Sequence, residues 1–278
     1  AAEAAPDGAT IYVMSDVEMN QMAWVWEKEL TITSYGVDPV TLSRGENFHT
    51  NTDPARQRYN PAMIEVGGET EQGTVSSLIL THIILDDMGK YEGEYFVQAD
   101  SEGDGETTVS RSEVPNTSIV QDAIIATYNG MGTITLGDGA ELRNYGGMSA
   151  VRLSGGELVM EEGSAILDTT ENEREKGASG SFGPAGAVWL QGGILTMNGG
   201  TIGGDKGVMM NGRALYADGG TANIGGTIQN IHGTDAAWQG QNGVAVHLRS
   251  HGEATLASTG EITNVTGTNA GNNCAIWT

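Results

Sequence analysis

The feature that most restricts the fold is a repeat of short alternating runs that stop at paired glycines. In AVWLQGGILTMNGGTIGG, residues 187–204, apolar and small or polar residues alternate, break at two glycines and alternate again. Similar stretches, with successive starts 27, 37, 27, 31 and 30 residues apart, begin at Ala123, Ala150, Ala187, Ala214, Ala245 and Ala275. Each complete stretch holds three strand-like runs separated by glycine-rich turns. Three strands per irregular turn of about 30 residues predict a parallel β-helix, whose coils must stack because no strand is stable alone.

Other repeat architectures fit this pattern less well. Ankyrin and tetratricopeptide arrays have similar periods but need helices, and a β-propeller blade needs four strands and roughly 40 residues. The 42 glycines against six prolines in 278 residues suit many tight turns, because glycine reaches positive φ without steric cost. Parallel crossovers are overwhelmingly right-handed. The expected fold is therefore all-β, a right-handed parallel β-helix with three short strands per coil.

The alternation also assigns side chains to faces. Inward positions are expected for Val151, Leu153, Val188, Leu190, Leu215, Val246 and Leu248 in the first strand, for Ile134, Leu136, Leu158, Met160, Leu195, Met197, Ile224 and Leu256 in the second, and for Leu142, Ile166, Ile202, Ile228 and Ile262 in the third. The second strand turns Thr135, Val159, Thr196, Asn223 and Thr255 to solvent. Two residues past the third-strand position we expect a polar row that hydrogen-bonds one coil to the next, made of Asp86, Asn144, Asp168, Asn230 and Asn264 and interrupted by Gly204.

The strongest binding pattern is a row of outward side chains on the first strand. It comprises Arg152, Trp189, Tyr216, His247 and Trp277, preceded by Glu65 and Ile125. Long insertions leave after the third strand and return before the first, at residues 87–118, 169–186, 205–213, 231–244 and 265–274, and bring Trp238 to the same edge. Aromatic faces with polar tips bind sugar rings and protein surfaces. Two interpretations stay open: an exposed ligand face, or a strip that the loops cover as an extension of the core.

The chain reads as one domain, residues 1–278, without a linker. Residues 1–30 are expected to cap the open N-terminal end, since an exposed core and free sheet edge invite aggregation. Within them MNQMAWVWEKE, near Met19, suggests a short helix or a wide turn. The last repeat is cut off at AIWT, so we expect the β-helix to continue in a longer parent chain or to pair with another strand.

Charge and composition exclude several classes of partner. The formal net charge of −23 repels phosphate backbones and anionic lipid, so neither nucleic acid nor a membrane surface is an expected partner. The chain contains no run of about 18 apolar residues, so the sequence predicts no membrane-spanning segment. A single cysteine, Cys274, cannot form an internal disulfide.

The frame LTMNGGTI at Leu195, with ELTITS at Glu29 and AVWLQGG at Ala187, resembles repeat units of pectate-lyase-like β-helix regions in large bacterial cell-surface proteins, in the style of Gram-positive bacteria. The resemblance spans about residues 10–278. It implies a secreted protein at the cell surface or in the cell wall. The function that the resemblance implies is that of a non-enzymatic adhesin or stalk module, which binds host or microbial glycan or a surface protein. The alternative is a polysaccharide lyase or glycoside hydrolase acting on acidic polysaccharide, because this fold hosts both kinds of function.

Catalytic and metal motifs are incomplete. Polygalacturonase-like hydrolases combine Asn-Thr-Asp, Asp-Asp and Gly-His-Gly with a basic motif. The chain has NTD at residues 51–53 and Asp86–Asp87 but neither of the other two, so no catalytic residue is assigned. No cofactor is required by any motif, although ADSEGDGETT offers Asp100, Glu102, Asp104 and Glu106 as Ca²⁺ ligands. Arg111 stands where an EF-hand loop needs glutamate, which leaves a solvated acidic loop as the other interpretation.

Overall fold

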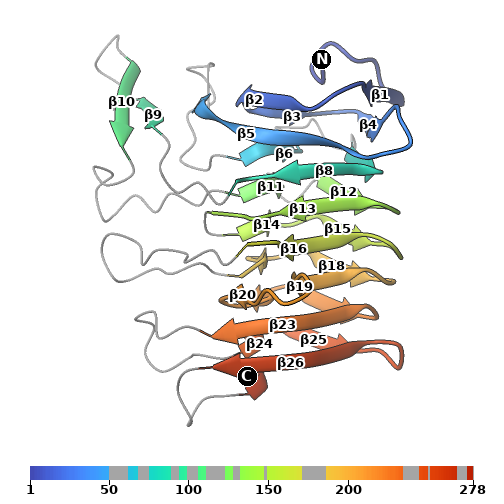
Figure 1. Ribbon diagram of the computed structural model, residues 1–278, viewed down its shortest axis with the longest axis vertical. Helices are drawn as coiled ribbons and strands as arrows, with labels where there is room; N and C mark the ends of the chain where they lie inside the picture. The colour runs from blue at the N-terminus through green and yellow to red at the C-terminus, as the bar shows by residue number, and fades with distance from the viewer. Residues whose placement is uncertain are drawn as a thin grey trace.

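The computed structural model is an all-β protein, with no helix among the residues that it describes (Figure 1). No segment of that part of the chain is a helix that could span a membrane. The described residues are 1–49, 62–67, 75–88, 94–98, 106–110, 123–127, 132–146, 149–170, 186–233, 244–249, 251–267 and 274–277.

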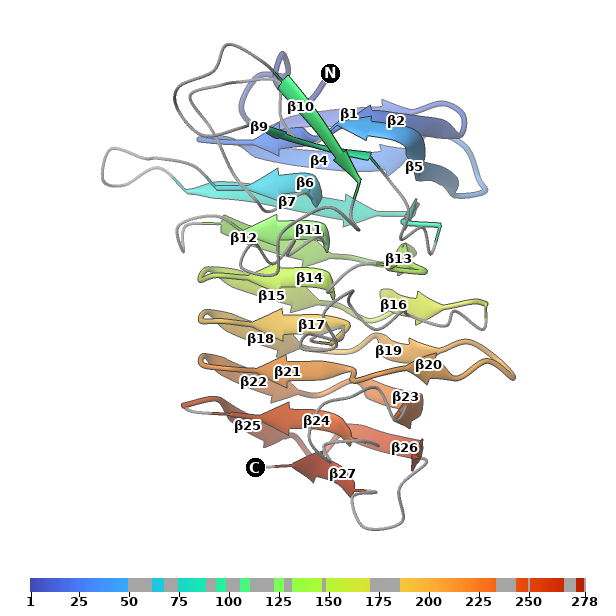
Figure 2. The same cartoon turned by 90° about the vertical axis from the view of Figure 1, so that its left-hand side faces the viewer.

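Three parallel sheets run along the molecule, and Figure 2 looks onto the first of them. The first sheet contains β3 (Ala23–Val25), β6 (Ala62–Val66), β11 (Ala123–Thr127), β14 (Ser149–Leu153), β17 (Val188–Leu190), β21 (Leu215–Ala217), β24 (Val244–Leu248) and β27 (Cys274–Trp277). The second contains β1 (Ala9–Val13), β4 (Glu29–Ser34), β7 (Ser76–Thr81), β12 (Gly132–Leu136), β15 (Glu157–Met160), β18 (Ile194–Met197), β22 (Thr221–Ile224) and β25 (Glu253–Leu256). The third contains β2 (Val17–Gln21), β5 (Val40–His49), β8 (Ile83–Asp86), β13 (Ala140–Arg143), β16 (Ala165–Asp168), β19 (Thr201–Gly204), β20 (Met210–Asn211), β23 (Thr227–Gly233) and β26 (Glu261–Gly267).

The order of strands along the chain confirms the parallel β-helix. The chain visits the first, second and third sheets in turn, as in β14–β15–β16 and again in β17–β18–β19, and each strand pairs in register with its counterpart in the next coil. The predicted insertions lie between a strand of the third sheet and the following strand of the first. One of them contains an antiparallel pair, β9 (Glu94–Gln98) with β10 (Glu106–Ser110).

A single apolar core fills the space between the sheets. Its side chains come from the predicted inward positions, for example Leu158 above Leu195 and Ile166 above Ile202, all fully buried. Burying such a side chain contributes about 1.5–3 kcal/mol relative to leaving it exposed. Leu256 differs from the other inward residues because it is 47% exposed, whereas Ile224 on the neighbouring strand β22 is buried. The reason is that no described strand pairs with β25 on its other side.

The N-terminal residues are part of the solenoid. Instead of a helix or wide turn near Met19, the chain forms β2 and β3, which pair with β5 and β6. The segment expected to cap the end, residues 1–30, therefore supplies strands to all three sheets, and residues 1–8 precede the first strand. The ammonium of Lys28 donates hydrogen bonds of 2.9–3.2 Å to the carbonyl oxygens of Ala2, Glu3 and Ala5. Two of these alanines, Ala2 and Ala5, pack against the core, so this segment covers its end.

Two positions are shifted by one residue from the predicted alignment. Ala126, not Ile125, lies in register with Glu65 and Arg152, while Ile125 pairs with inward residues. On the third sheet Asp86 pairs with Arg143, so it stands one residue before the row that contains Asn144. Both shifts fall where the sequence does not alternate, in AIIAT and in ILDD.

The paired glycines stack at the corner between the first and second sheets. Gly156, Gly193 and Gly220 all have φ between +75° and +79°. A Cβ at Gly156 would clash with the carbonyl oxygen of Gly132 in the coil above, and the same holds for Gly193 against Gly156 and for Gly220 against Gly193. This corner therefore requires glycine both for its conformation and for its close backbone approach.

We expect Gly156→Ala to destabilise the protein far more than Gly207→Ala. Both residues have φ near +77°, so both variants carry a strain of about 1–2 kcal/mol. A Cβ at Gly207 meets open space, whereas one at Gly156 meets backbone atoms of the neighbouring coil. Denaturant unfolding of the two variants measures the difference, and equal losses would contradict the stacked-corner explanation.

Candidate functional site

The predicted row on the first strands is a continuous column in the first sheet. Tyr216 on β21 lies in register with Trp189 on β17 and with His247 on β24. Its ring centre is 6.4 Å from that of Trp189 and 5.0 Å from that of His247. Arg152 precedes these residues in the same register and Trp277 follows them. Coil stacking thus brings the predicted side chains together, as the sequence indicated.

Four side chains of the column are buried in the part of the chain that the structure describes. Arg152, Trp189, Tyr216 and His247 are between 2% and 8% exposed. This burial matches the interpretation of a covered strip that extends the core. The side chain of Trp277 and the whole of Trp238 lie outside the described residues. The binding role given to the column stays a prediction, and the four buried side chains present no open face for it.

Two arginines cover part of the column. The guanidinium of Arg249 donates a hydrogen bond of 3.2 Å to the Tyr216 hydroxyl. The guanidinium carbon of Arg213 lies 5.4 Å from the centre of the Tyr216 ring, a cation–π distance. Further along, Arg152 donates a bond of 3.4 Å to Oε1 of Gln191. Tyr216 therefore has two cationic neighbours within the protein.

The surroundings keep His247 neutral. The pKa of His247 is lowered to about 4, chiefly by burial and also by the positive charges of Arg213 and Arg249, which Asp218 partly offsets. An imidazole with so low a pKa carries no charge near neutral pH. It therefore serves as a packed ring in the column.

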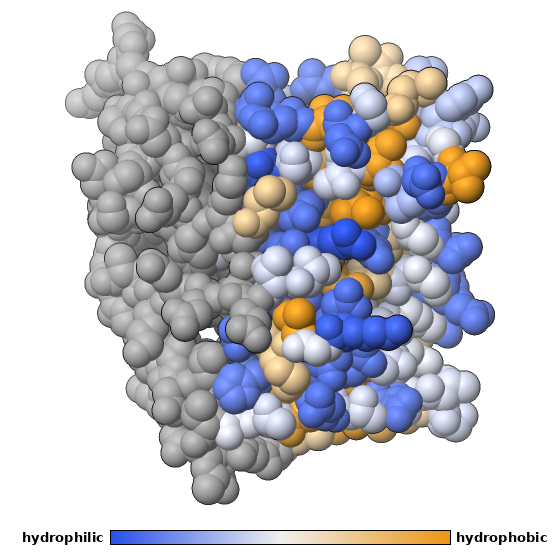
Figure 3. Space-filling model, in the orientation of Figure 1, coloured by the Kyte–Doolittle hydropathy of each residue, from blue (hydrophilic) through white to orange (hydrophobic). Residues whose placement is uncertain are grey.

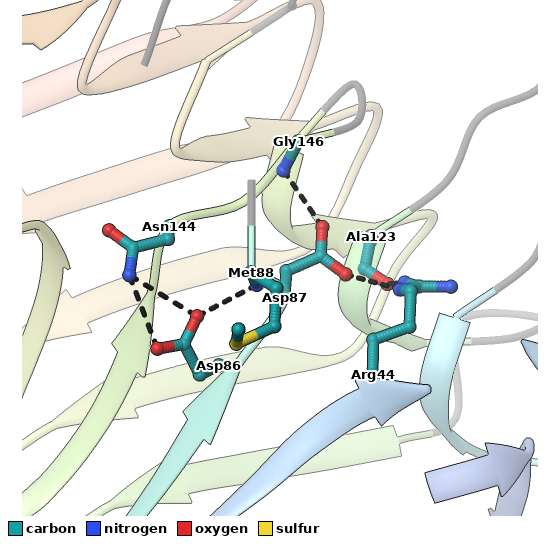
Figure 4. A network of polar contacts seen from close by, with 7 residues as sticks. All are labelled: Arg44, Asp86, Asp87, Met88, Ala123, Asn144 and Gly146. Carbon is teal, nitrogen blue, oxygen red and sulfur yellow. Dashed lines mark hydrogen bonds and ion pairs between the residues drawn. The ribbon is translucent and has the colours of Figure 1, made fainter. Parts of the chain in front are cut away.

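The adjacent acids Asp86 and Asp87 have different structural partners (Figure 4). Asp87 is buried, forms an ion pair with Arg44 of β5, and accepts a hydrogen bond of 2.8 Å from the Gly146 amide. Asp86 accepts hydrogen bonds from the Met88 amide at 2.7 Å and from the Asn144 side chain at 3.2 Å. Both carboxylates thus join neighbouring coils.

Sequence reasoning missed the Arg44–Asp87 pair. Arg44 also donates a bond of 3.0 Å to the Ala123 carbonyl, and its guanidinium lies 4.5 Å from the centre of the Phe48 ring. The one available signal is an arginine in a strand-like run, VTLSR, whose partner is 43 residues away. A buried pair of this kind needs every further hydrogen bond to offset the loss of water.

The polar row on the third sheet links coils as predicted. The Asn264 side chain donates a bond of 2.6 Å to Oδ1 of Asn230, and Nδ2 of Asn230 donates one of 3.0 Å to the Gly204 carbonyl. Asn144, Asn230 and Asn264 all have φ near +50°, a conformation that asparagine tolerates better than most residues. Their conformation and their bonds both assign the row a structural role at this corner.

The predicted Ca²⁺ ligands fall where side chains are not described. Asp100, Glu102 and Asp104 lie outside the described residues, and Glu106 begins β10 with its side chain outside them. The NTD motif at residues 51–53 is also outside. Within the described part of the chain, no group of three or more histidine, cysteine, aspartate or glutamate side chains is placed to hold a metal ion.

No family model, curated protein or solved structure matches this chain. What the arrangement does is therefore inferred from the residues and contacts of the chain itself.

We expect Asp87→Ala to lower the free energy of unfolding by about 3 kcal/mol, because it leaves the buried Arg44 charge without its counter-ion. The neighbouring change Asp86→Ala removes hydrogen bonds of a more accessible group and should cost about 1 kcal/mol. Replacing Arg44 and Asp87 together by methionine should recover most of the loss. Urea unfolding tests this order, and equal effects of the two alanine variants would contradict it.

His247 should make stability depend on pH between about 6.5 and 4. As pH falls through this window, the unfolded chain protonates this histidine while the folded protein does not, so unfolding becomes more favourable. We expect His247→Gln to reduce the fall of the melting temperature in this window, and His251→Gln, at an exposed position, to leave it unchanged. A wild-type slope in His247→Gln would refute the assignment.

Proposed function

We propose that this chain is a non-enzymatic module of a bacterial surface protein, acting as a stalk or adhesin. The observation that supports this most is the parallel pairing of successive coils in three sheets around one core. At the usual strand spacing of 4.8 Å, an eight-stranded sheet extends roughly 34 Å along the solenoid axis. A structure held by hydrogen bonds from coil to coil suits a rigid spacer that carries binding surfaces away from its attachment.

The use of the acidic and aromatic groups favours a scaffold over the alternative, a polysaccharide lyase or glycoside hydrolase. Glycoside hydrolysis needs two carboxylates that flank an accessible bond. Here Asp87 is paired with Arg44, and Asp86 holds the Asn144 side chain. The rings of Trp189, Tyr216 and His247 in the aromatic column are packed inside the protein. These groups stabilise the coils instead of facing a substrate.

The proposed partners are host or microbial glycans or surface proteins in the extracellular space. Contacts with them would be made by surfaces other than the buried column. Connections on a rigid scaffold are the usual place for binding residues. In this chain the long connections run from the third sheet to the first, and repeat along one edge of the solenoid.

A direct assay separates the two functions. The protein is incubated with polygalacturonate and other acidic polysaccharides, with and without Ca²⁺, and reducing ends and unsaturated products are measured. We expect no release above the buffer control, and retention of the protein on an array of glycans and surface proteins. Product release that is lost in Asp53→Asn or Asp86→Asn, with the fold intact by circular dichroism, would establish the enzyme instead.

A further inference from the structure

The corner between the second and third sheets exposes apolar side chains in the first two coils. Tyr12 lies near the end of β1 and Met14 directly follows it, while Tyr35 and Val37 follow the end of β4. All four side chains are exposed, by 58% to 93%. In the space-filling view, hydrophobic residues reach the surface in the upper part of the described face, over these coils (Figure 3). We call Tyr12, Met14, Tyr35 and Val37 the corner patch.

The backbone that carries the corner patch is fixed by hydrogen bonds between coils. The Tyr35 amide donates a bond of 2.9 Å to the Val13 carbonyl. Two further bonds of 2.8 Å hold the start of β5: the Val40 amide donates to the Ser34 hydroxyl, and the Thr41 amide donates to the Asp16 carboxylate. The patch is therefore preorganised, which lowers the entropy lost when a partner binds.

The two tyrosines are exposed and pack against each other. Their ring centres are 6.0 Å apart and the rings meet edge to face at 85°. Tyrosine and methionine are enriched at the centres of protein interfaces, and the exposed face of a tyrosine attracts arginine and lysine. A thioether at Met14 adapts to irregular apolar groups. The patch thus suits a partner that carries both apolar and cationic side chains.

The charge around the patch selects for a basic partner. Asp16, Glu18 and Asp38 are exposed beside these turns. Residues 1–43 contain one basic residue, Lys28, whose ammonium already binds three carbonyl groups, against seven acidic ones: Glu3, Asp7, Asp16, Glu18, Glu27, Glu29 and Asp38. A second copy of this chain, with the same net charge of −23, would be repelled.

We propose that the corner patch is a docking surface for a basic, amphipathic segment of a partner protein, in which arginine or lysine alternates with apolar residues. The apolar side chains pack against Met14 and Val37. The cationic groups stack on the tyrosine rings and face the surrounding carboxylates. The interface adds to the proposed function and does not depend on it.

The probe is a fluorescent peptide in which arginine alternates with leucine, and its binding to the whole chain is measured by fluorescence anisotropy. We expect saturable binding that weakens as salt is added, because salt screens exposed charges. Replacing Tyr35 or Tyr12 by alanine should weaken it about tenfold, the scale of an aromatic anchor. Asp38→Asn should weaken it less and reduce its salt dependence.

Matched controls come from elsewhere on the solenoid. Ile194→Ala removes an exposed apolar side chain from the second sheet, and Glu162→Gln removes an exposed charge from a distant turn. Both variants should bind the peptide like the wild type. Control peptides in which glutamate replaces arginine, or serine replaces leucine, should not bind the wild-type protein. Equal binding by the Tyr35→Ala and Ile194→Ala variants overturns the proposal. So does equal affinity for the glutamate peptide, or self-association of the chain that Tyr35→Ala abolishes. A negative peptide result leaves the polysaccharide assay unaffected.

Discussion

Everything in this molecule depends on the parallel pairing of each strand with its counterpart one coil away. Strands of three to six residues, such as β17 and β7, cannot persist alone, so each coil exists only because its neighbours hold it. The same pairing repeats each side chain at a fixed spacing. It thereby creates the apolar core, the asparagine row and the aromatic column at once. Stability and surface pattern consequently share one cause.

The buried polar contacts refine this arrangement. The Arg44–Asp87 pair and the asparagine row connect side chains across coils, at the corner where the chain leaves the third sheet. An apolar core alone does not fix the register fully, because a strand shifted by two residues still turns its apolar side chains inward. A carboxylate that must meet one guanidinium and one amide, as Asp87 does with Arg44 and Gly146, admits a single alignment. We therefore expect these contacts to contribute more to the uniqueness of the fold than to its total stability.

Sequence alone predicted the fold class, the three faces and the asparagine row, because alternation and repeat length reflect local geometry. It misplaced Ile125, since five successive buried positions in β11 leave no alternation to read. It left open whether the aromatic column is covered, because the Arg249 side chain reaches Tyr216 from the next coil. It missed β2 and β3, whose polar and aromatic residues acquire strand structure from β5 and β6. Each of these properties depends on contacts between distant residues.

The glycine column at the corner of the first and second sheets has a consequence for how such a chain changes over time. Each of these glycines is demanded by the backbone of the neighbouring coil, so a point substitution there disturbs two repeats. A duplicated or deleted repeat, however, carries its own glycine and restores the same contact at the new junction. Length should therefore vary in whole coils, while the glycine at this corner of the coils that carry Gly156, Gly193 and Gly220 stays constant.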